Sequence, residues 1–77
     1  MMNDSDPARI VEIAREPIEL YKLLKIENLV ASGGEAKVVI AEGLVRVNGE
    51  IETRKRKKIL ANDIVSYGKE TIRIAVK

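Results

Sequence analysis

Residues 32–49 read SGGEAKVVIAEGLVRVNG, and the apolar pattern of this stretch changes from helical to alternating partway along. Ser32 followed by Glu35 is the S-x-x-E capping box, in which each side chain accepts a hydrogen bond from the other residue's backbone N–H. Apolar residues then recur at helical spacing up to Gly43, which suits the left-handed residue that ends a helix. The stretch therefore predicts a short helix over about residues 33–42.

The second half of the same stretch predicts a strand and a tight hairpin. Val45 and Val47 fall on one side of an extended chain, and Arg46 falls on the other. The Asn-Gly pair at 48–49 is the strongest two-residue hairpin signal, because both central positions of a type I′ turn need positive φ. We expect the return strand to cover residues 51–53.

A second helix is expected before this stretch. Pro17 suits the first turn of a helix, and apolar residues recur at helical spacing between Leu20 and Leu24. We expect that helix to end near residues 27–28. Upstream, residues 9–14 are rich in β-branched side chains and favour a short strand, although a helix capped at residues 6–7 stays open as the alternative.

Short strands are expected after the hairpin. Residues 64–67 and 71–76 alternate, with turn signals at 62–63 and 68–69. The predicted fold class is α+β, with two helices packed on a small, mostly antiparallel sheet. We expect residues 1–8 to be a flexible leader and residues 9–77 to form a single domain.

Composition narrows the possible functions. The 77 residues include no Cys, so the chain has neither a disulfide nor a zinc–thiolate site, and no His, which is the commonest general base and metal ligand. No nucleophile–base pair or phosphate-binding G-x-x-x-x-G-K-[ST] loop is present. We expect a protein without enzymatic activity or cofactor, and with no small-molecule substrate. No apolar run is long enough to span a bilayer, and the polar start does not resemble a secretory signal, so we expect a cytoplasmic protein and a monomer.

Positive charge is concentrated in the second half of the chain. Residues 1–44 hold 8 acids and 5 bases, whereas residues 45–77 hold 4 acids and 9 bases. Five of those bases are consecutive: Arg54, Lys55, Arg56, Lys57 and Lys58. Adjacent cations repel one another unless an anion neutralises them, and the run adjoins a hairpin rather than a tail. These features favour a phosphate-binding segment over a solvated loop or a nuclear signal.

The start of the second helix is a further candidate for phosphate binding. Gly33 and Gly34 leave the first backbone N–H groups of that helix uncovered, and Lys37 shares their side of the helix. By itself, this motif fits a plain glycine turn better than a phosphate site. The chain has only two aromatic residues, Tyr21 and Tyr67, so we expect recognition of RNA shape and backbone rather than stacking on single-stranded bases.

The order of these motifs resembles the S4 RNA-binding domain. The similarity covers about residues 16–67, through LYKLLK at 20–25, SGGEAK at 32–37, the Glu-Gly pair at 42–43 and VRVNGE at 45–50. It is strongest to small stand-alone S4 proteins of bacteria. The resemblance implies an α-L motif, in which two helices pack on a small sheet, and binding of structured RNA, often ribosomal. It also implies RNA contacts from Ser32, Gly33, Gly34, Lys37 and the strand from Arg46 to Asn48, flanked by residues 54–58.

We therefore expect a non-catalytic module that binds structured RNA through phosphates and shape. The alternative is a protein-interaction domain whose basic patch docks on an acidic protein surface. DNA binding is the weaker possibility, because no helix combines a helix-turn-helix partner with base-reading side chains on one face.

Overall fold

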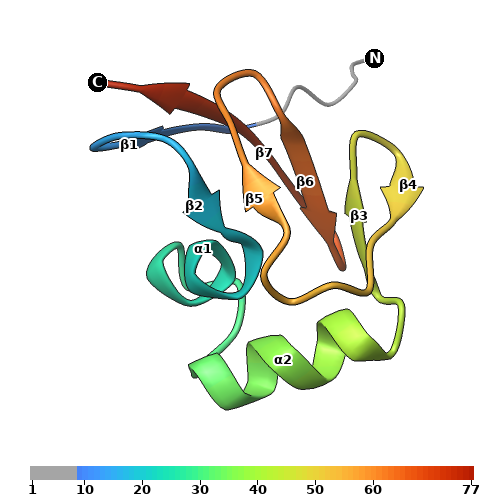
Figure 1. Cartoon of the computed structure of the whole chain (residues 1–77). Helices are drawn as coiled ribbons and strands as arrows, with labels where there is room; N and C mark the ends of the chain where they lie inside the picture. The colour runs from blue at the N-terminus through green and yellow to red at the C-terminus, as the bar shows by residue number, and fades with distance from the viewer. Residues whose placement is uncertain (1–8) are drawn as a thin grey trace.

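The computed structural model describes residues 9–77 as seven strands and two helices, and the leader predicted over residues 1–8 lies outside these residues. A five-stranded sheet has the order β1-β7-β6-β3-β4, and β2 pairs with β5 in a separate two-stranded ribbon. Figure 1 shows both helices at one end of the strands. The elements are β1 (Arg9–Ile13), β2 (Ile18–Glu19), α1 (Leu20–Ile26), α2 (Gly33–Ala41), β3 (Val45–Val47), β4 (Glu50–Ile51), β5 (Lys58–Ile59), β6 (Ile64–Tyr67) and β7 (Glu70–Val76).

Helix α2 has nearly the predicted bounds. It begins at Gly33 after the N-cap Ser32 and ends at Ala41, one residue before the predicted end. Gly43 has a φ of +77°, and its N–H donates to the Ile40 carbonyl at 3.0 Å, while the Leu44 N–H donates to the Val39 carbonyl at 3.1 Å. These two bonds are the Schellman motif that glycine permits at a helix end.

The predicted start of the first helix was wrong. Helix α1 begins at Leu20, not near Pro17, because the two residues before Leu20 form strand β2. Ile18 pairs with Ile59 and Glu19 with Lys58 in antiparallel register. The helical signals of this segment are local, and a strand from far along the chain overrides them.

The main sheet is antiparallel apart from one edge. Asn48 and Gly49 have φ values of 53° and 85°, which confirms the predicted tight hairpin between β3 and β4. The return strand is shorter than predicted and ends at Ile51. Residues 9–13 form a strand, as the β-branched composition favoured, and it pairs in parallel with β7.

One aliphatic core joins the helices to the sheet. Leu20, Leu23 and Leu24 of α1 are fully buried, and the predicted stripe of α2 is buried at Ala36 and Ile40, with 7% exposure at Val39. The strands contribute their inward positions to the same cluster: Val11, Ile13, Val45, Val47, Ile59, Val65, Ile72 and Ile74. Both helices therefore pack against the sheet through one shared core.

Candidate nucleic-acid interface

The start of α2 is built by a cap that differs in one bond from the prediction. The Glu35 N–H donates to Ser32 Oγ at 3.1 Å, as expected. The Glu35 carboxylate accepts from the Ala31 N–H at 2.8 Å rather than from the N–H of Ser32. The cap still fixes the first turn, in which the leading N–H groups have no carbonyl partner within the helix.

Glycine at the start of α2 is not required by the fold. The positive φ values of glycine occur at positions 43, 49 and 68, so neither Gly33 nor Gly34 has a backbone conformation that excludes other residues. A Cβ at Gly33 would lie 4.0 Å from the Tyr21 ring, and one at Gly34 would lie 3.8 Å from Ser32 Oγ, which are ordinary contacts. Because glycine also lowers helix stability, its presence here favours a use for the bare backbone over a plain turn.

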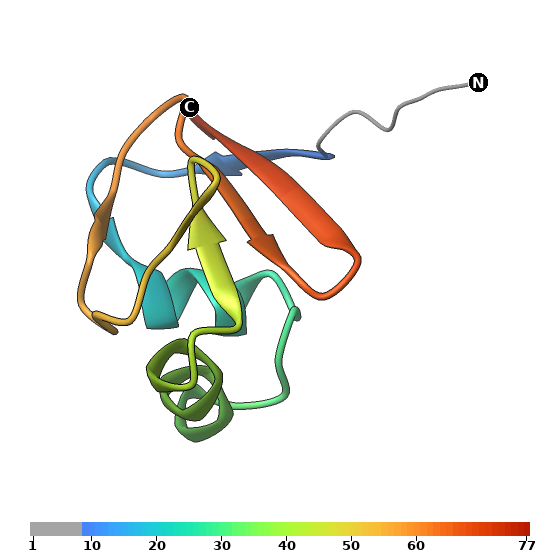
Figure 2. The ribbon, with the colours of Figure 1, turned by 90° about the vertical axis from the view of Figure 1, so that its right-hand side faces the viewer.

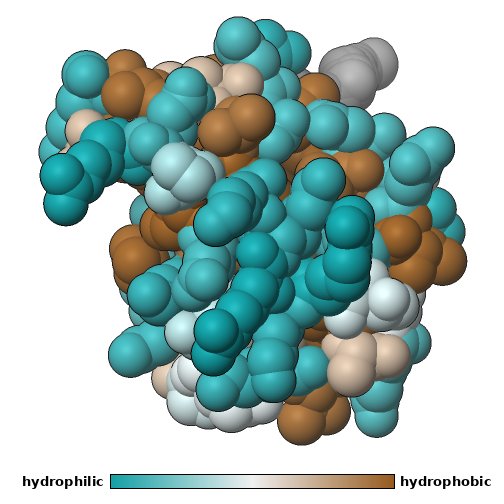
Figure 3. Space-filling view, in the orientation of Figure 1, coloured by the Kyte–Doolittle hydropathy of each residue, from teal (hydrophilic) through white to brown (hydrophobic). Residues whose placement is uncertain are grey.

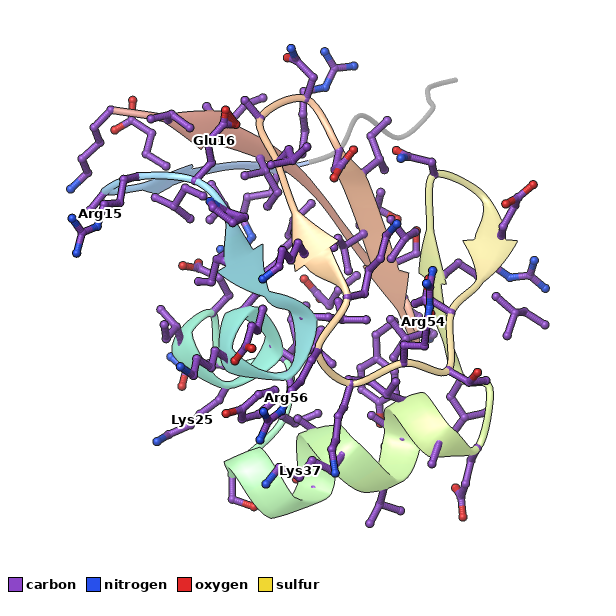
Figure 4. All side chains as sticks on the ribbon, in the orientation of Figure 1. Arg15, Glu16, Lys25, Lys37, Arg54 and Arg56 are labelled. Carbon is purple, nitrogen blue, oxygen red and sulfur yellow. The ribbon has the colours of Figure 1, made fainter. Side chains whose placement is uncertain are left out.

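Lys37 links the start of α2 to helix α1. Its Nζ lies 5.0 Å from the centroid of the Tyr21 ring, a cation–π contact, and Lys22 Nζ lies 5.9 Å from the same ring. Tyr21 is half-buried and packs against the core, so the ring is a fixed surface beneath an exposed lysine. In Figure 4, Lys37 and Arg56 project toward the same region beside α1 and α2.

The basic segment forms a tight turn and not an extended strand. The Lys57 N–H donates to the Arg54 carbonyl at 3.1 Å, which closes a tight turn before β5 begins at Lys58. The carbonyls of Lys57 and Lys55 accept from the backbone N–H groups of Leu20 at 2.9 Å and Tyr21 at 3.0 Å.

This turn therefore takes the place of a side-chain cap for α1, which has none. Its two carbonyls satisfy N–H groups at the start of that helix, which would otherwise have no backbone partner. The turn is also placed close to Lys37, because Tyr21 contacts both the backbone of the basic turn and the side chain of Lys37. The structure thus brings together two features that stand apart in the sequence.

The five cations have different environments. Arg54 forms a two-bond ion pair with Glu52, with Nε–Oε2 at 2.9 Å and Nη2–Oε1 at 3.0 Å. These hydrogen bonds lower the pKa of Glu52 to about 2 and raise the pKa of Arg54. Within residues 9–77, the other four cations of the run have no carboxylate partner: Lys55, Arg56, Lys57 and Lys58.

A hollow lies between the β3–β4 hairpin and the basic segment. Its polar lining consists of Asn48, three cations and three acidic residues: Arg54, Lys57 and Lys58, and Glu50, Glu52 and Asp63. Figure 3 shows a largely hydrophilic band across this side of the molecule, in the orientation of Figure 1. Four of the residues expected at the interface therefore meet at one depression.

Arg46 and Asn48 have other partners. Arg46 lies between buried Val45 and Val47 on β3, so its side chain points away from the core, and Nη1 donates to the Gly49 carbonyl at 3.2 Å.

The amide of Asn48 is engaged within the protein. Its Nδ2 donates to Asp63 Oδ1 at 3.1 Å, and its Oδ1 accepts from the Ile64 N–H at 2.9 Å. The observed role of this side chain is to fix the hairpin against the turn before β6.

Two residues at this surface were not identified from the sequence as part of the interface. Tyr21 lies within the segment predicted as the first helix, and only the packing of α1 against α2 reveals that Lys37 covers its ring. Glu52 belongs to this surface through its ion pair with Arg54. Its spacing two residues before Arg54 was the available signal, since such residues share a side of an extended chain.

Comparison with known proteins is consistent with this architecture. A model of the S4 domain matches residues 11–75. The chain belongs to the S4 domain family. The fold expected from the resemblance is thereby confirmed, and a solved relative carries the same motif: the solution structure of YbcJ from Escherichia coli, titled as an α-L motif involved in RNA binding. It aligns with a TM-score of 0.68 and 38% identity over 97% of this chain and 96% of that one.

Two curated relatives are similar over most of their length. The "Putative RNA-binding protein YbcJ" of Escherichia coli (strain K12) is 47% identical over 57 residues, which cover 74% of this chain and 81% of that protein. The "Probable ribosome maturation protein RlbA" of Bacillus subtilis (strain 168) is 36% identical over 58 residues, which cover 75% of this chain and 82% of that protein. Across residues 9–77, neither helix has the length and apolar character needed to cross a bilayer.

Proposed function

We propose that this protein is a non-catalytic module that binds structured RNA through backbone phosphates and shape. The observation that carries the proposal is the turn at residues 54–57, whose backbone is bonded to the start of α1. Among the residues that the structure describes, three cations of this turn have no carboxylate partner and lie near Tyr21 and Lys37: Lys55, Arg56 and Lys57. Lys58 follows at the start of β5. A preformed cationic surface of this kind suits the regular phosphate spacing of a folded RNA.

The surface has two parts in this proposal. At the start of α2, Ser32, Gly33 and Gly34 present uncovered backbone and Lys37 supplies a charge for one phosphate group. The basic segment follows a neighbouring stretch of RNA backbone with Lys55, Arg56, Lys57 and Lys58. Arg46 and Asn48 contribute at the hairpin: Arg46 offers charge on the outer face, and Asn48 holds the turn that borders the hollow.

The names of the relatives support this reading. One is named as an RNA-binding protein and another as a ribosome maturation protein. We propose ribosomal RNA as the target and the cytoplasm as the location, with the protein acting as a monomer. Co-sedimentation with ribosomal particles from a lysate, at rising salt, tests this finer proposal, and a protein that stays in the supernatant at physiological salt contradicts it.

The general proposal is tested by fluorescence-anisotropy titration. The probes are a structured RNA hairpin, a DNA duplex of matched length and an acidic polypeptide, each titrated at several salt concentrations. We expect the RNA hairpin to bind most tightly, with a log–log salt slope of magnitude up to roughly 4 if Lys37 and the four cations each contact one phosphate. Preference for the acidic polypeptide would instead identify a protein-interaction domain.

Equal binding of all three probes would also contradict the proposal. In that case the basic segment would be a surface that attracts any polyanion. A loss of binding near physiological salt with every probe would show the same, because non-specific binding is largely electrostatic.

A further inference from the structure

The two side chains of the Glu52–Arg54 ion pair differ strongly in their exposure to solvent. The Glu52 side chain is only 12% exposed, whereas the Arg54 side chain is 71% exposed. Glu52 is also fixed through its backbone, because its N–H donates to the Val45 carbonyl on the buried strand β3 at 2.9 Å. The Glu52 carboxylate is therefore held in place by the protein, and the Arg54 guanidinium is exposed to solvent.

The carboxylate holds Arg54 by three hydrogen bonds. Glu52 Oε2 accepts from the Arg54 backbone N–H and from Nε, both at 2.9 Å, and Oε1 accepts from Nη2 at 3.0 Å. A guanidinium has five N–H groups in a planar fork, and the side-on pair uses two of them. The end formed by Nη1 and Nη2 keeps three N–H groups, which are enough for a two-bond contact with a phosphate.

We propose that Glu52 is a positioning residue for RNA binding, which holds the Arg54 guanidinium in the orientation that receives a phosphate at the hollow beside Lys57 and Lys58. This inference deepens the proposed function and rests on it. An arginine held in place loses less conformational freedom on binding than a free one. Glu52 thereby raises RNA affinity although its charge has the same sign as the ligand's.

Simple electrostatics predicts the opposite sign, and this makes the inference testable. Glu52→Gln raises the net charge of the protein by one unit, so a purely Coulombic role for Glu52 predicts tighter RNA binding. The positioning role predicts binding that is about two- to tenfold weaker, from the freedom that Arg54 regains. The salt slope should stay the same, because Arg54 keeps its charge and still contacts the phosphate.

The matched control is Glu50→Gln. Glu50 is exposed on β4, close in sequence to Glu52, and its substitution changes the charge by the same amount. We expect this control to bind the RNA hairpin more tightly at low salt, with an undiminished slope. If Glu52→Gln tightens binding as much as the control does, the positioning role is overturned.

A second variant covers the case in which Glu52→Gln unfolds. Arg54→Lys keeps the charge and removes the planar fork at a largely exposed position, so it leaves the core untouched. We expect it to weaken binding by a similar factor, and the double variant with Glu52→Gln to bind no more weakly than either single variant. Additive losses, or wild-type affinity in Arg54→Lys, would overturn the inference. Failure of the wild-type protein to bind RNA would overturn the proposed function itself and this inference with it.

Discussion

Replacement of Gly34 by Ala is expected to have opposite effects on the stability of α2 and on the proposed phosphate contact at its first turn. Gly34 is exposed, its φ is not positive, and a Cβ at this position would lie 3.8 Å from Ser32 Oγ. The methyl group therefore causes no strain, and removal of a flexible glycine stabilises the helix. We expect a gain of about 0.5 kcal/mol, at the lower end of the usual range because Gly34 lies in the first turn.

The same methyl group covers the backbone N–H groups that the proposed phosphate contact uses. A hydrogen bond to a charged group is worth about 1.5 to 3 kcal/mol, and we expect its distortion to cost about 1 kcal/mol, or roughly fivefold in Kd. The salt slope should not change, because no cation has been removed. Gly34→Ala is thus expected to be more stable and to bind RNA more weakly.

Two measurements on the same preparation test this prediction. Thermal unfolding followed by circular dichroism should show a Tm higher by about 2 to 4 °C. Anisotropy titration with the RNA hairpin should show the weaker Kd. A more stable protein with unchanged affinity would refute the phosphate site at the start of α2, and a less stable protein would refute the argument that the fold tolerates a side chain there.

The remaining predictions concern a binding lysine, a core valine and the partly buried carboxylate of Glu52. Lys37→Ala should lower the salt slope of RNA binding by about 0.7 to 0.9 without loss of fold. The control is Lys69→Ala, which should leave the slope unchanged, because Lys69 lies in the β6–β7 turn, which Figure 2 shows on the side away from the basic segment. Equal effects of the two substitutions would show that only net charge matters. Val47→Asp should abolish cooperative unfolding in a urea titration, because Val47 is only 7% exposed and an unpaired charge in the core is costly; a folded variant would contradict the assigned core. Hydrogen bonds from Arg54 lower the pKa of Glu52 from 4.5 to about 2, so its contribution to stability is complete above pH 4.5 and is lost as the pH falls toward 2. We expect the difference in unfolding free energy between the wild type and Glu52→Gln to be about 1 kcal/mol at pH 6, since Arg54 is solvent-exposed, and to shrink as the pH falls through about 2; a pH-independent difference would contradict the ion pair.

Local signals predicted the elements whose geometry depends on a few adjacent residues. The cap at Ser32, the left-handed residue at Gly43 and the Asn-Gly hairpin at 48–49 are all defined within a single turn of chain. Each such feature has its hydrogen-bond partners nearby, so the residue types alone specify it. Helix α2 and the turn of the β3–β4 hairpin were accordingly predicted almost to the residue, whereas β4 ends at Ile51 and not at residue 53 as predicted.

Elements that depend on distant partners were not predictable in this way. Pro17 and the acidic residues around it are good helix-start signals, yet residues 18–19 form a strand because residues 58–59 pair with them. The same pairing turns the basic segment back toward α1, so its cations do not alternate along an extended chain. Nothing in the local composition of either segment identifies the other as its partner.

The sequence identified the separate segments of the candidate interface, but it did not predict that they form one surface. The glycines and Lys37 of α2, and the five cations, each stand out in the sequence. Their meeting point is Tyr21, whose N–H bonds the basic turn and whose ring lies under Lys37. Arg46 came from the family resemblance, and strand alternation places it on the other face of the sheet from the core.

The most direct test of the RNA-binding surface is a titration of the ¹⁵N-labelled protein with the RNA hairpin, followed through its backbone amide resonances. We expect saturable shifts concentrated at residues 32–37 and 54–58, with smaller shifts around Tyr21, which connects them. Resonances of β1 and β7, which form the far edge of the sheet, should stay in place. The largest shifts on β1 and β7, or no saturable shift at physiological salt, would contradict the account.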